Sequence, residues 1–228
     1  KVRAYHMLRH LAEIHDVTLV SFVRPDDTRE AIEHLAGLCT GVHAVPMRRS
    51  AWRNARAAVK GLLTNSPMVV ARDEIAEMSR TLSRLTEAVP FQVVHADQLS
   101  MAGYGQLAAG QAARQNGKQP RRPATVLDEH NAIYLLTRRM ADTESNALRR
   151  LVIRREAGAF ARYEAQMLAA YDAVLTVTEE DRLHLLALLA DAGHYYDADN
   201  GTKFKVIPIC GDAEQVTGIP RVPGGPPT

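Results

Sequence analysis

The stretch Thr125-Val126-Leu127-Asp128-Glu129-His130-Asn131 decides the fold that we expect for this chain. A short apolar run leads directly into a charged and polar cluster, and a long helical pattern follows it. In proteins that alternate strands and helices, ligands bind just beyond the carboxyl ends of parallel strands. We therefore expect the residues from Asp128 to Asn131 to stand at such a strand end.

Two other stretches of the sequence repeat this arrangement. Phe91-Gln92-Val93-Val94 leads into His95-Ala96-Asp97-Gln98, and Ala173-Val174-Leu175-Thr176-Val177 leads into Thr178-Glu179-Glu180-Asp181. If these strands are parallel neighbours in one sheet, their ends meet at the same edge. The three polar ends would then line one crevice, which is the candidate ligand site.

Hydrophobic periodicity predicts strands and helices in alternation along the chain. The strands are predicted at 17–23, 42–47, 91–95, 124–128, 172–177 and 204–207. The helices are predicted at 2–15, 28–38, from 48 to Pro67, at 69–88, 99–115, 132–170 with a break at Asp142-Thr143, and 178–193. Because no hairpin signals separate the strands, we expect an α/β fold, with one doubly wound, Rossmann-like parallel sheet and helices on both faces.

Composition excludes several classes of protein. The 228 residues carry a net charge of +2, which argues against a dedicated nucleic-acid binder. Cys39 and Cys210 are the two cysteines, which fits buried thiols in a reducing compartment. The sequence contains no 18-residue apolar run and no signal peptide, so we expect a cytoplasmic protein, either free or associated with a membrane surface.

The two ends of the chain suggest that it is part of a longer protein. The sequence begins at Lys1 without methionine and enters a helical pattern at once. It ends in a stretch rich in proline and glycine, which is typical of a linker. We expect a domain over residues 1–211 and an interdomain linker over 212–228.

His130 is the leading candidate for a catalytic residue. An imidazole at a strand end can donate a hydrogen bond to a ligand hydroxyl or phosphate, and it titrates near neutral pH. The alternative is a loop histidine bonded to a backbone carbonyl. Its neighbours Glu129 and Asn131 are predicted to contact substrate at the same strand end.

His95 and Asp97 form a second candidate pair. Side chains two residues apart on a strand share a face, so these two groups could orient a substrate hydroxyl together. Gln98 follows at the same strand end and is predicted to lie beside them. The alternative is a turn in which Asp97 caps the helix that follows.

Two further sites are predicted at helix starts. Free amides near Thr178 and Glu179 could hold a phosphate or a carboxylate, whereas the alternative is a purely structural capping box. Lys1 and Arg3 open the first helix, where positive charge would suit an anionic substrate. A frayed terminus is the alternative for these two residues.

The segment 48–72 contains six basic residues and no acidic residue. Large apolar side chains are interleaved with the basic ones, so a helix here would have an apolar and a basic flank. Such a helix can lie on an anionic membrane surface or dock on a protein partner, so a non-catalytic binding module is an alternative function. The alternative is a solvated basic helix whose apolar side faces the core. The predicted membrane contacts are Arg48, Arg49, Trp52, Arg53 and Arg56.

Other patterns do not indicate chemistry. Asp197-Ala198-Asp199 lies in a turn-forming stretch without the spacing of a calcium loop, and the histidines lack the spacing of zinc ligands. No nucleophile elbow and no glycine-rich phosphate motif occur. In the long helical segment, mixed charges favour a solvated face over a nucleic-acid patch: Arg154, Arg155, Glu156, Arg162 and Glu164.

Several stretches resemble the N-terminal domain of family 4 glycosyltransferases, which have the two-domain GT-B fold. The resemblance covers nearly the whole chain and is closest to sugar transferases associated with bacterial exopolysaccharide systems. Its most specific parts are VLDEHNAIYLLTRR and the VTEEDR stretch, in this order and spacing. The other matching stretches are KVRAYHMLRHLAEIHDVTLVSF, FQVVHADQLSMAGYGQLA and KVIPICGD.

The resemblance implies a function for the domain. In such enzymes the N-terminal domain binds the glycan or lipid-linked acceptor, and a C-terminal domain holds the nucleotide sugar. Transfer usually proceeds with retention and without an essential metal. His130 would touch the transferred sugar, and His95, Asp97 and Gln98 would lie on the acceptor side.

The resemblance also implies that parts of the enzyme lie outside this sequence. The first strand of the family and a Gly-Gly turn would precede Lys1, and the nucleotide-sugar domain would follow Thr228. We therefore expect this chain alone not to catalyse transfer.

Overall fold

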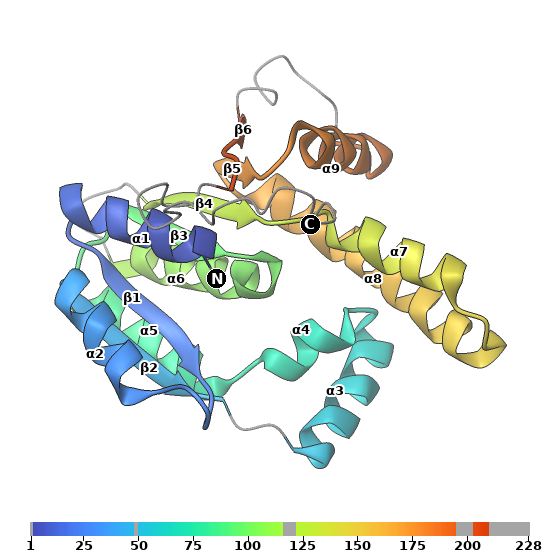
Figure 1. Ribbon diagram of the computed structural model, residues 1–228, viewed down its shortest axis with the longest axis horizontal. Coiled ribbons are helices and arrows are strands. Elements are labelled where there is room, and N and C mark those ends of the chain that lie inside the picture. The colour runs from blue at the N-terminus through green and yellow to red at the C-terminus, as the bar shows by residue number, and fades with distance from the viewer. Residues whose placement is uncertain (1, 48–49, 116–121, 195–202, 210–228) are drawn as a thin grey trace, which may run out of the picture.

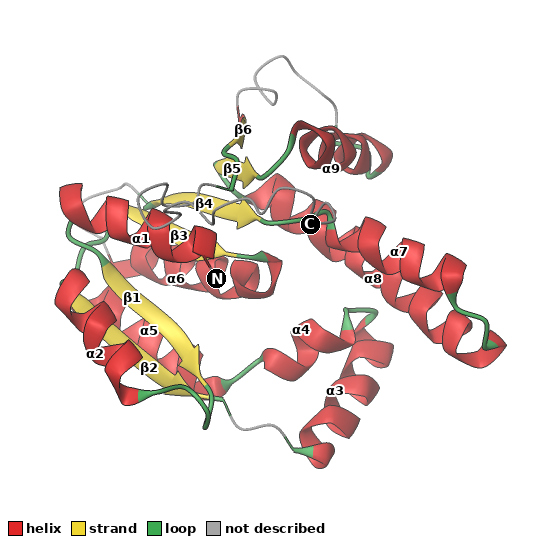
Figure 2. Ribbon diagram, in the orientation of Figure 1, coloured by secondary structure: helices red, strands yellow, loops and turns green. Residues whose placement is uncertain are grey.

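The computed structural model describes residues 2–47, 50–115, 122–194 and 203–209 (Figure 1). Within these ranges, helices and strands alternate along the chain (Figure 2). The elements of the first half are α1 (Val2–Ile14), β1 (Thr18–Val23), α2 (Arg29–Leu38), β2 (Gly41–Pro46), α3 (Ala51–Thr64), α4 (Met68–Asp73) and α5 (Ala76–Ala88). Those of the second half are β3 (Val93–Asp97), α6 (Leu99–Gln115), β4 (Ala124–Glu129), α7 (Ile133–Thr143), α8 (Ala147–Ala170), β5 (Ala173–Thr176), α9 (Glu179–Asp191) and β6 (Phe204–Val206).

The strands pair only in parallel within the described ranges, as the alternating pattern predicted. They form two sheets, β1-β2 and β3-β4-β5-β6, and not the one continuous sheet that we expected. In the larger sheet, Asp97 pairs with Asp128, and Glu129 pairs with Thr176. The carboxyl ends of β3, β4 and β5 therefore lie at one edge, where the candidate site was predicted.

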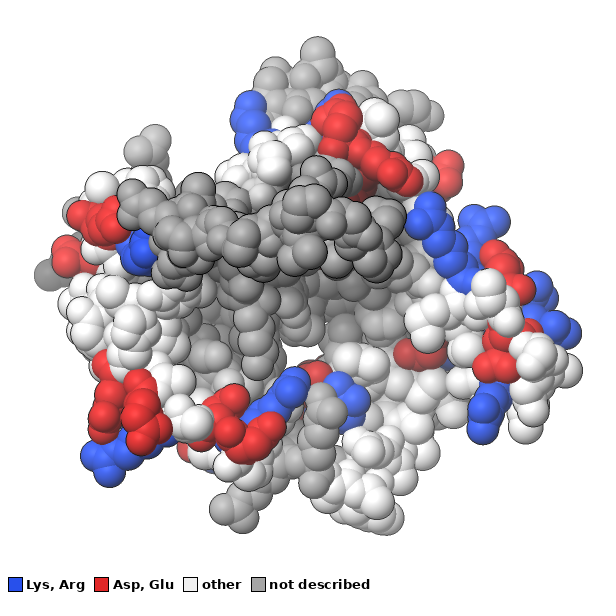
Figure 3. Space-filling model, viewed as in Figure 1, with Lys and Arg blue, Asp and Glu red and all other residues white. Residues whose placement is uncertain are grey.

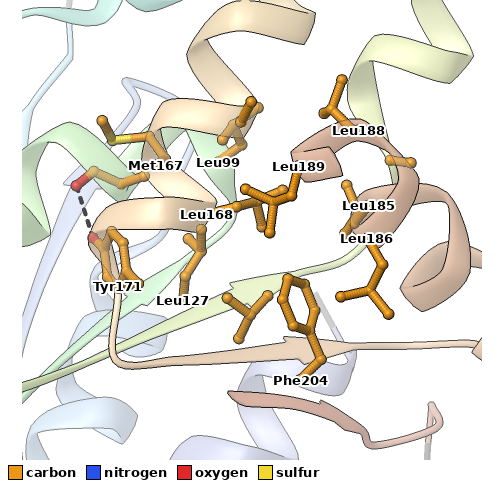
Figure 4. Close-up of a cluster of buried hydrophobic side chains, with 14 of the residues drawn as sticks. Leu99, Leu127, Met167, Leu168, Tyr171, Leu185, Leu186, Leu188, Leu189 and Phe204 are labelled. Carbon is orange, nitrogen blue, oxygen red and sulfur yellow. Dashed lines mark hydrogen bonds between the residues drawn. The ribbon is translucent and has the colours of Figure 1, made fainter. Parts of the chain in front are cut away.

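One face of the larger sheet packs on α6, α8 and α9 (Figure 4). Leu127 of β4 and Val174 of β5 are fully buried there, against Leu168 of α8 and Leu185 of α9. Tyr171 joins the same core, and its hydroxyl donates a 2.7 Å hydrogen bond to the carbonyl of Ala102 on α6. This packed face holds the ends of β3 and β4 in a fixed position.

The helix predicted over 69–88 is two helices, α4 and α5, because the chain is extended at Glu74 and Ile75. The hydroxyl of Tyr104 accepts a hydrogen bond from the amide of Ile75 and donates one to the carbonyl of Asp73. A side chain of α6 thus satisfies the backbone groups that the break exposes. The break predicted at Asp142-Thr143 exists but falls slightly later, since α7 ends at Thr143 and α8 begins at Ala147.

The solvated face predicted for the long helix is wrong for Glu164. Its side chain is 0 % exposed, and it lies in helical register with the buried residues Ala165 and Leu168. A carboxylate in this position must accept hydrogen bonds, because an unpaired buried charge is very costly.

No helix in the described part of the chain has the length and hydropathy that crossing a membrane requires.

Candidate functional site

The ends of β3 and β4 bring His130 and Asp97 together. Nε2 of His130 lies 2.9 Å from Oδ1 of Asp97 and 3.9 Å from Oδ2 of Asp128. The pairing of Asp97 with Asp128 across the strands, followed by the turn at His130, produces this contact. The hydrogen bond of His130 is thus made with a side chain from the neighbouring strand, and the two residues that the sequence singled out separately form one unit.

Arg3 fixes the second carboxylate of this site. Its guanidinium contacts Asp128 through Nη2 at 2.9 Å and through Nε at 3.2 and 3.3 Å. Nη1 also donates to the carbonyls of Ile207 and Pro208, which follow β6. Arg3 therefore ties α1 to the end of β4 and to the segment after β6.

The burial of Arg3 corrects both interpretations of this residue. Its side chain is only 4 % exposed, so it does not belong to a frayed terminus. Its charge is directed to Asp128, which does not fit the predicted direct contact with an anionic substrate. Lys1, the other residue of that prediction, lies outside the described residues.

His95 stands next to this cluster, on the face of β3 that it shares with Asp97. Although part of the residue is exposed, the protein around its ring lowers the pKa of His95, and the charges of Asp128 and Asp97 oppose this shift. The imidazole is thus biased toward its neutral form, in which one ring nitrogen accepts a hydrogen bond.

Gln98 and Asn131 occupy the exposed rim of the site. Gln98 has a backbone φ of +75°, which is unfavourable for a residue with a side chain. Its amide donates a 3.0 Å hydrogen bond to the carbonyl of Asp128, so the strained turn joins the two strand ends. Non-glycine residues held in this conformation concentrate at functional sites.

Glu129 does not fit its predicted contact with substrate. Neighbouring residues on a strand point to opposite faces, and the side chain of Glu129 is only 1 % exposed. Burial, together with the charges of Glu164, Asp128 and Asp181, raises the pKa of Glu129 well above its ordinary value. One of its carboxyl oxygens has no hydrogen-bond partner among the described residues.

Thr178 caps the start of α9, as the pattern predicted. Oγ1 of Thr178 accepts a 3.0 Å hydrogen bond from the amide of Asp181, and it donates to the carboxylate of Asp181. Glu179 is exposed and pairs with Arg182 of its own helix. Binding of a phosphate or carboxylate by these amides stays a prediction.

The helix α3 exposes its large apolar side chains. Trp52 is 72 % exposed and Leu63 is 82 % exposed, whereas the small residues Ala57 and Gly61 are buried. The alternative in which the apolar side faces the core is therefore wrong. Arg56 is exposed, Arg48 and Arg49 lie outside the described residues, and the side chain of Arg53 is not described.

A parallel α/β fold with a polar cluster at the strand ends is the architecture of a ligand-binding enzyme domain. A family model described as "Glycosyl transferase 4-like domain" matches residues 1–195. The chain therefore belongs to this family of glycosyltransferases, which transfer a sugar from a donor to an acceptor. No curated protein and no solved structure matches the chain.

Sequence reasoning missed two buried contacts that shape this site, the ion pair of Arg3 with Asp128 and the position of Glu164. A weak signal existed for each. Arg3 lies in the first turn of a helix that leads into a strand, which places it near the sheet, and Glu164 falls in the apolar register of α8. Neither signal names the partner, because the partners of Arg3 lie 125 and more residues away along the chain.

Proposed function

We propose that this domain is the acceptor-binding half of a retaining, metal-independent glycosyltransferase. The whole enzyme would move a sugar from a nucleotide-sugar donor to a glycan or lipid-linked acceptor, as in exopolysaccharide biosynthesis, on the cytoplasmic side of a membrane. The family match supports the transfer of a sugar. The observation that carries the proposal is the hydrogen bond between His130 and Asp97 at the carboxyl ends of β3 and β4.

This hydrogen bond defines the chemistry that His130 can perform. A carboxylate only accepts hydrogen bonds, so Nε2 of His130 carries the proton that points to Asp97. Nδ1 is then the ring nitrogen that can hydrogen-bond a hydroxyl of the transferred sugar. As the bond from the sugar to the diphosphate breaks and the bond to the acceptor oxygen forms, a fixed imidazole holds the sugar in the reactive geometry.

The proposal that no metal is essential rests on the charges of the site. The ligand atoms of Asp97, Asp128 and His130 lie within 4.8 Å of one another, which is a spacing that a cation could use. The guanidinium of Arg3 already lies against Asp128, and the imidazole of His130 already bonds Asp97. We expect turnover to be unchanged by EDTA, and a loss that Mg²⁺ or Mn²⁺ restores would contradict this part of the proposal.

The test is a transfer assay on the full-length protein with a panel of UDP- and GDP-sugars. A crude extract of lipid-linked glycans serves as the source of acceptor, and release of UDP or GDP is measured. We expect His130→Ala to lower turnover about 100-fold, the size of effect typical when one oriented polar group is lost. The control is His10→Ala, on the exposed surface of α1, which should leave turnover unchanged. Equal turnover in wild type and His130→Ala would refute the proposal.

A second candidate function, docking on an anionic membrane, is favoured by the exposed side of α3. Trp52, Arg56, Val59 and Leu63 recur at helical spacing, so they share one face, opposite the buried Ala57. Figure 3 shows a largely uncharged surface over α3. Apolar residues of this size, next to basic ones, insert into the headgroup region of a bilayer.

The first turns of α8 expose a second apolar face. Leu148, Leu151 and Val152 are exposed and lie on the face of α8 that also carries Arg155. Arg155 donates to the carbonyls of Gly61 and Ser66, at the end of α3, so this face of α8 is directed toward α3. Arg149 and Arg154 flank this apolar face of α8.

Vesicle pelleting tests this second function. We expect salt-sensitive binding of the chain to vesicles of phosphatidylglycerol and phosphatidylcholine, which Leu63→Ser and Leu148→Ser together abolish. The control is Leu183→Ser, which removes another exposed apolar residue, from α9. Failure to bind anionic vesicles at low salt would exclude docking through this surface.

A further inference from the structure

The turn that carries His130 leads into a helix whose own sequence provides no cap. α7 begins at Ile133, and the residue at its N-cap position is Ala132, whose side chain cannot accept a hydrogen bond. The first amides of any helix have no partner within the helix. The amides that follow His130 and Asn131 therefore need acceptors from elsewhere in the molecule.

Carboxylates from two other helices supply these acceptors. The oxygens of Glu164, on α8, accept from the amides of Ile133 at 2.9 Å and Tyr134 at 2.8 Å. Oδ1 of Asp181, on α9, accepts from the amide of Ala132 at 3.3 Å. Three consecutive amides directly after the His130 turn are thus held by side chains that are remote in sequence.

Glu164 restrains this turn more strongly than Asp181 does. It binds two amides with both oxygens, and its negative charge lies at the positive end of the α7 dipole. It is fully buried in α8, next to core residues such as Ala165 and Leu168, so its own position is rigid. A carboxylate this deeply buried would be strongly destabilising if the two amides did not compensate it.

Other acidic groups lie near Glu164. Glu129 lies beside it, from β4, and Asp181 faces it from α9. The pKa of Glu164 is raised to about 7, because the effect of burial exceeds the opposite effect of the two amide hydrogen bonds. The hydrogen bonds to the amides of Ile133 and Tyr134 use both carboxyl oxygens of Glu164 as acceptors, and the ionised carboxylate provides two such oxygens.

We propose that Glu164 is a positioning residue for sugar transfer, which fixes His130 by binding the first two amides of α7. The proposal rests on the proposed role of His130 and adds a residue that does not touch substrate. It predicts a specific loss of turnover, because a shift of about 1 Å in a catalytic group can cost about 100-fold in rate.

The same helix offers a matched control. Glu156 of α8 accepts a 2.8 Å hydrogen bond from the amide of Met68, the first residue of α4. It therefore caps a helix in the same way as Glu164, but at a helix start that does not carry His130. A variant of Glu156 loses the same kind of interaction without moving the candidate site.

The experiment measures UDP or GDP release by the full-length protein, with the sugar panel and the lipid-linked glycan extract used for His130→Ala. We expect Glu164→Gln to lower kcat about 10- to 100-fold, with KM for the donor changed less than about 3-fold. Glu156→Gln should keep kcat within about 2-fold of wild type. A kcat for Glu164→Gln equal to that for Glu156→Gln would overturn the proposal.

Two further variants separate a positioning role for Glu164 from a purely structural one. Glu164→Asp keeps the charge but is too short to reach both amides, so it should also lose kcat, and wild-type turnover in this variant would overturn the proposal. In the His130→Ala background, Glu164→Gln should cause no further loss, because both changes remove the same function. Independent, multiplicative losses would show that Glu164 does not act through His130. If His130→Ala itself is as active as wild type, the proposed function has failed, whereas a loss in His130→Ala alone refutes only the role of Glu164.

Discussion

Two regions were predicted from the sequence to be functional, namely the carboxyl ends of β3 and β4 and the outer face of α3. The burial of their side chains is opposite in the structure. At the strand ends, polar groups are matched to partners: Arg3 with Asp128, which are both buried, and His130 with Asp97, which is partly exposed. On α3, large apolar groups are exposed, and the side chain of Leu63 is 82 % exposed to solvent. One region buries polar groups, and the other leaves apolar groups in water.

This difference teaches where each region's function can lie. Polar groups that are paired with one another hold a geometry, and a fixed geometry is what catalysis requires. Exposed apolar groups contribute little to the stability of the folded chain, and they become useful when another surface covers them. The strand ends should therefore be sensitive to substitution in both stability and turnover, whereas α3 should be sensitive in membrane binding alone.

The largest expected effect is on the buried ion pair. Arg3→Leu leaves Asp128 buried without its cation, which typically costs about 3–5 kcal/mol of unfolding free energy. Urea denaturation of the chain measures this loss. The matched control is Arg29→Leu, which breaks an exposed pair with Glu33 and should cost less than about 1 kcal/mol. Similar urea midpoints for Arg3→Leu and Arg29→Leu would show that the ion pair of Arg3 with Asp128 does not stabilise the site.

The next effect is a dependence of stability on pH that comes from Glu164. Its ordinary pKa of 4.5 rises to about 7 in the folded chain, chiefly because it is buried. Between these two values the folded chain binds more protons than the unfolded chain, so the free energy of unfolding falls as pH rises from about 4.5 to 7. Glu164→Gln should flatten this part of the profile, and an unchanged slope would contradict the assignment to Glu164.

A smaller effect is expected at the strained turn of Gln98. Glycine adopts a positive φ without strain, so Gln98→Gly should raise the free energy of unfolding by about 1 kcal/mol. If the side chain contacts the acceptor, the same variant should lose turnover. Asn65→Gly is the control, since Asn65 is the other non-glycine residue with a positive φ in the described ranges. Loss of turnover in both variants, or in neither, would remove the argument that strain marks a binding residue.

The smallest effect on stability is expected on α3. Leu63→Ser should change the free energy of unfolding by less than about 0.5 kcal/mol, as is usual for an exposed residue. A thermal or urea melt measures it, next to the loss of vesicle binding. A cost of about 2 kcal/mol or more, on the order of that for a core residue, would place Leu63 in a packed interface of the chain and contradict the comparison.

The sequence predicted those parts of the fold and site that local patterns encode. Apolar runs followed by polar clusters located the ends of β3 and β4 at one edge of the sheet, although the contact of His130 with Asp97 was not predicted. The hydroxyl and carboxylate of Thr178 and Asp181 predicted the cap of α9, because a capping box is confined to one turn.

The rest depended on contacts that no local pattern reports. Arg3 meets Asp128 across 125 residues, so its charge alone suggested an exposed binding group. Glu164 belongs to a series of mixed charges that predicted a solvated face, because sequence does not show which carboxylates receive amides from another helix. The break between α4 and α5 likewise depends on the hydroxyl of Tyr104, which comes from α6.

The most direct test of the central claim is whether His130 and Asp97 act as one unit in sugar transfer. Turnover of UDP- and GDP-sugars by the full-length protein is measured for His130→Ala, Asp97→Ala and the double variant. The account predicts that each single change lowers kcat and that the double variant is no slower than His130→Ala, because Asp97 acts by orienting the imidazole. Wild-type turnover in His130→Ala, or losses that multiply in the double variant, would contradict it.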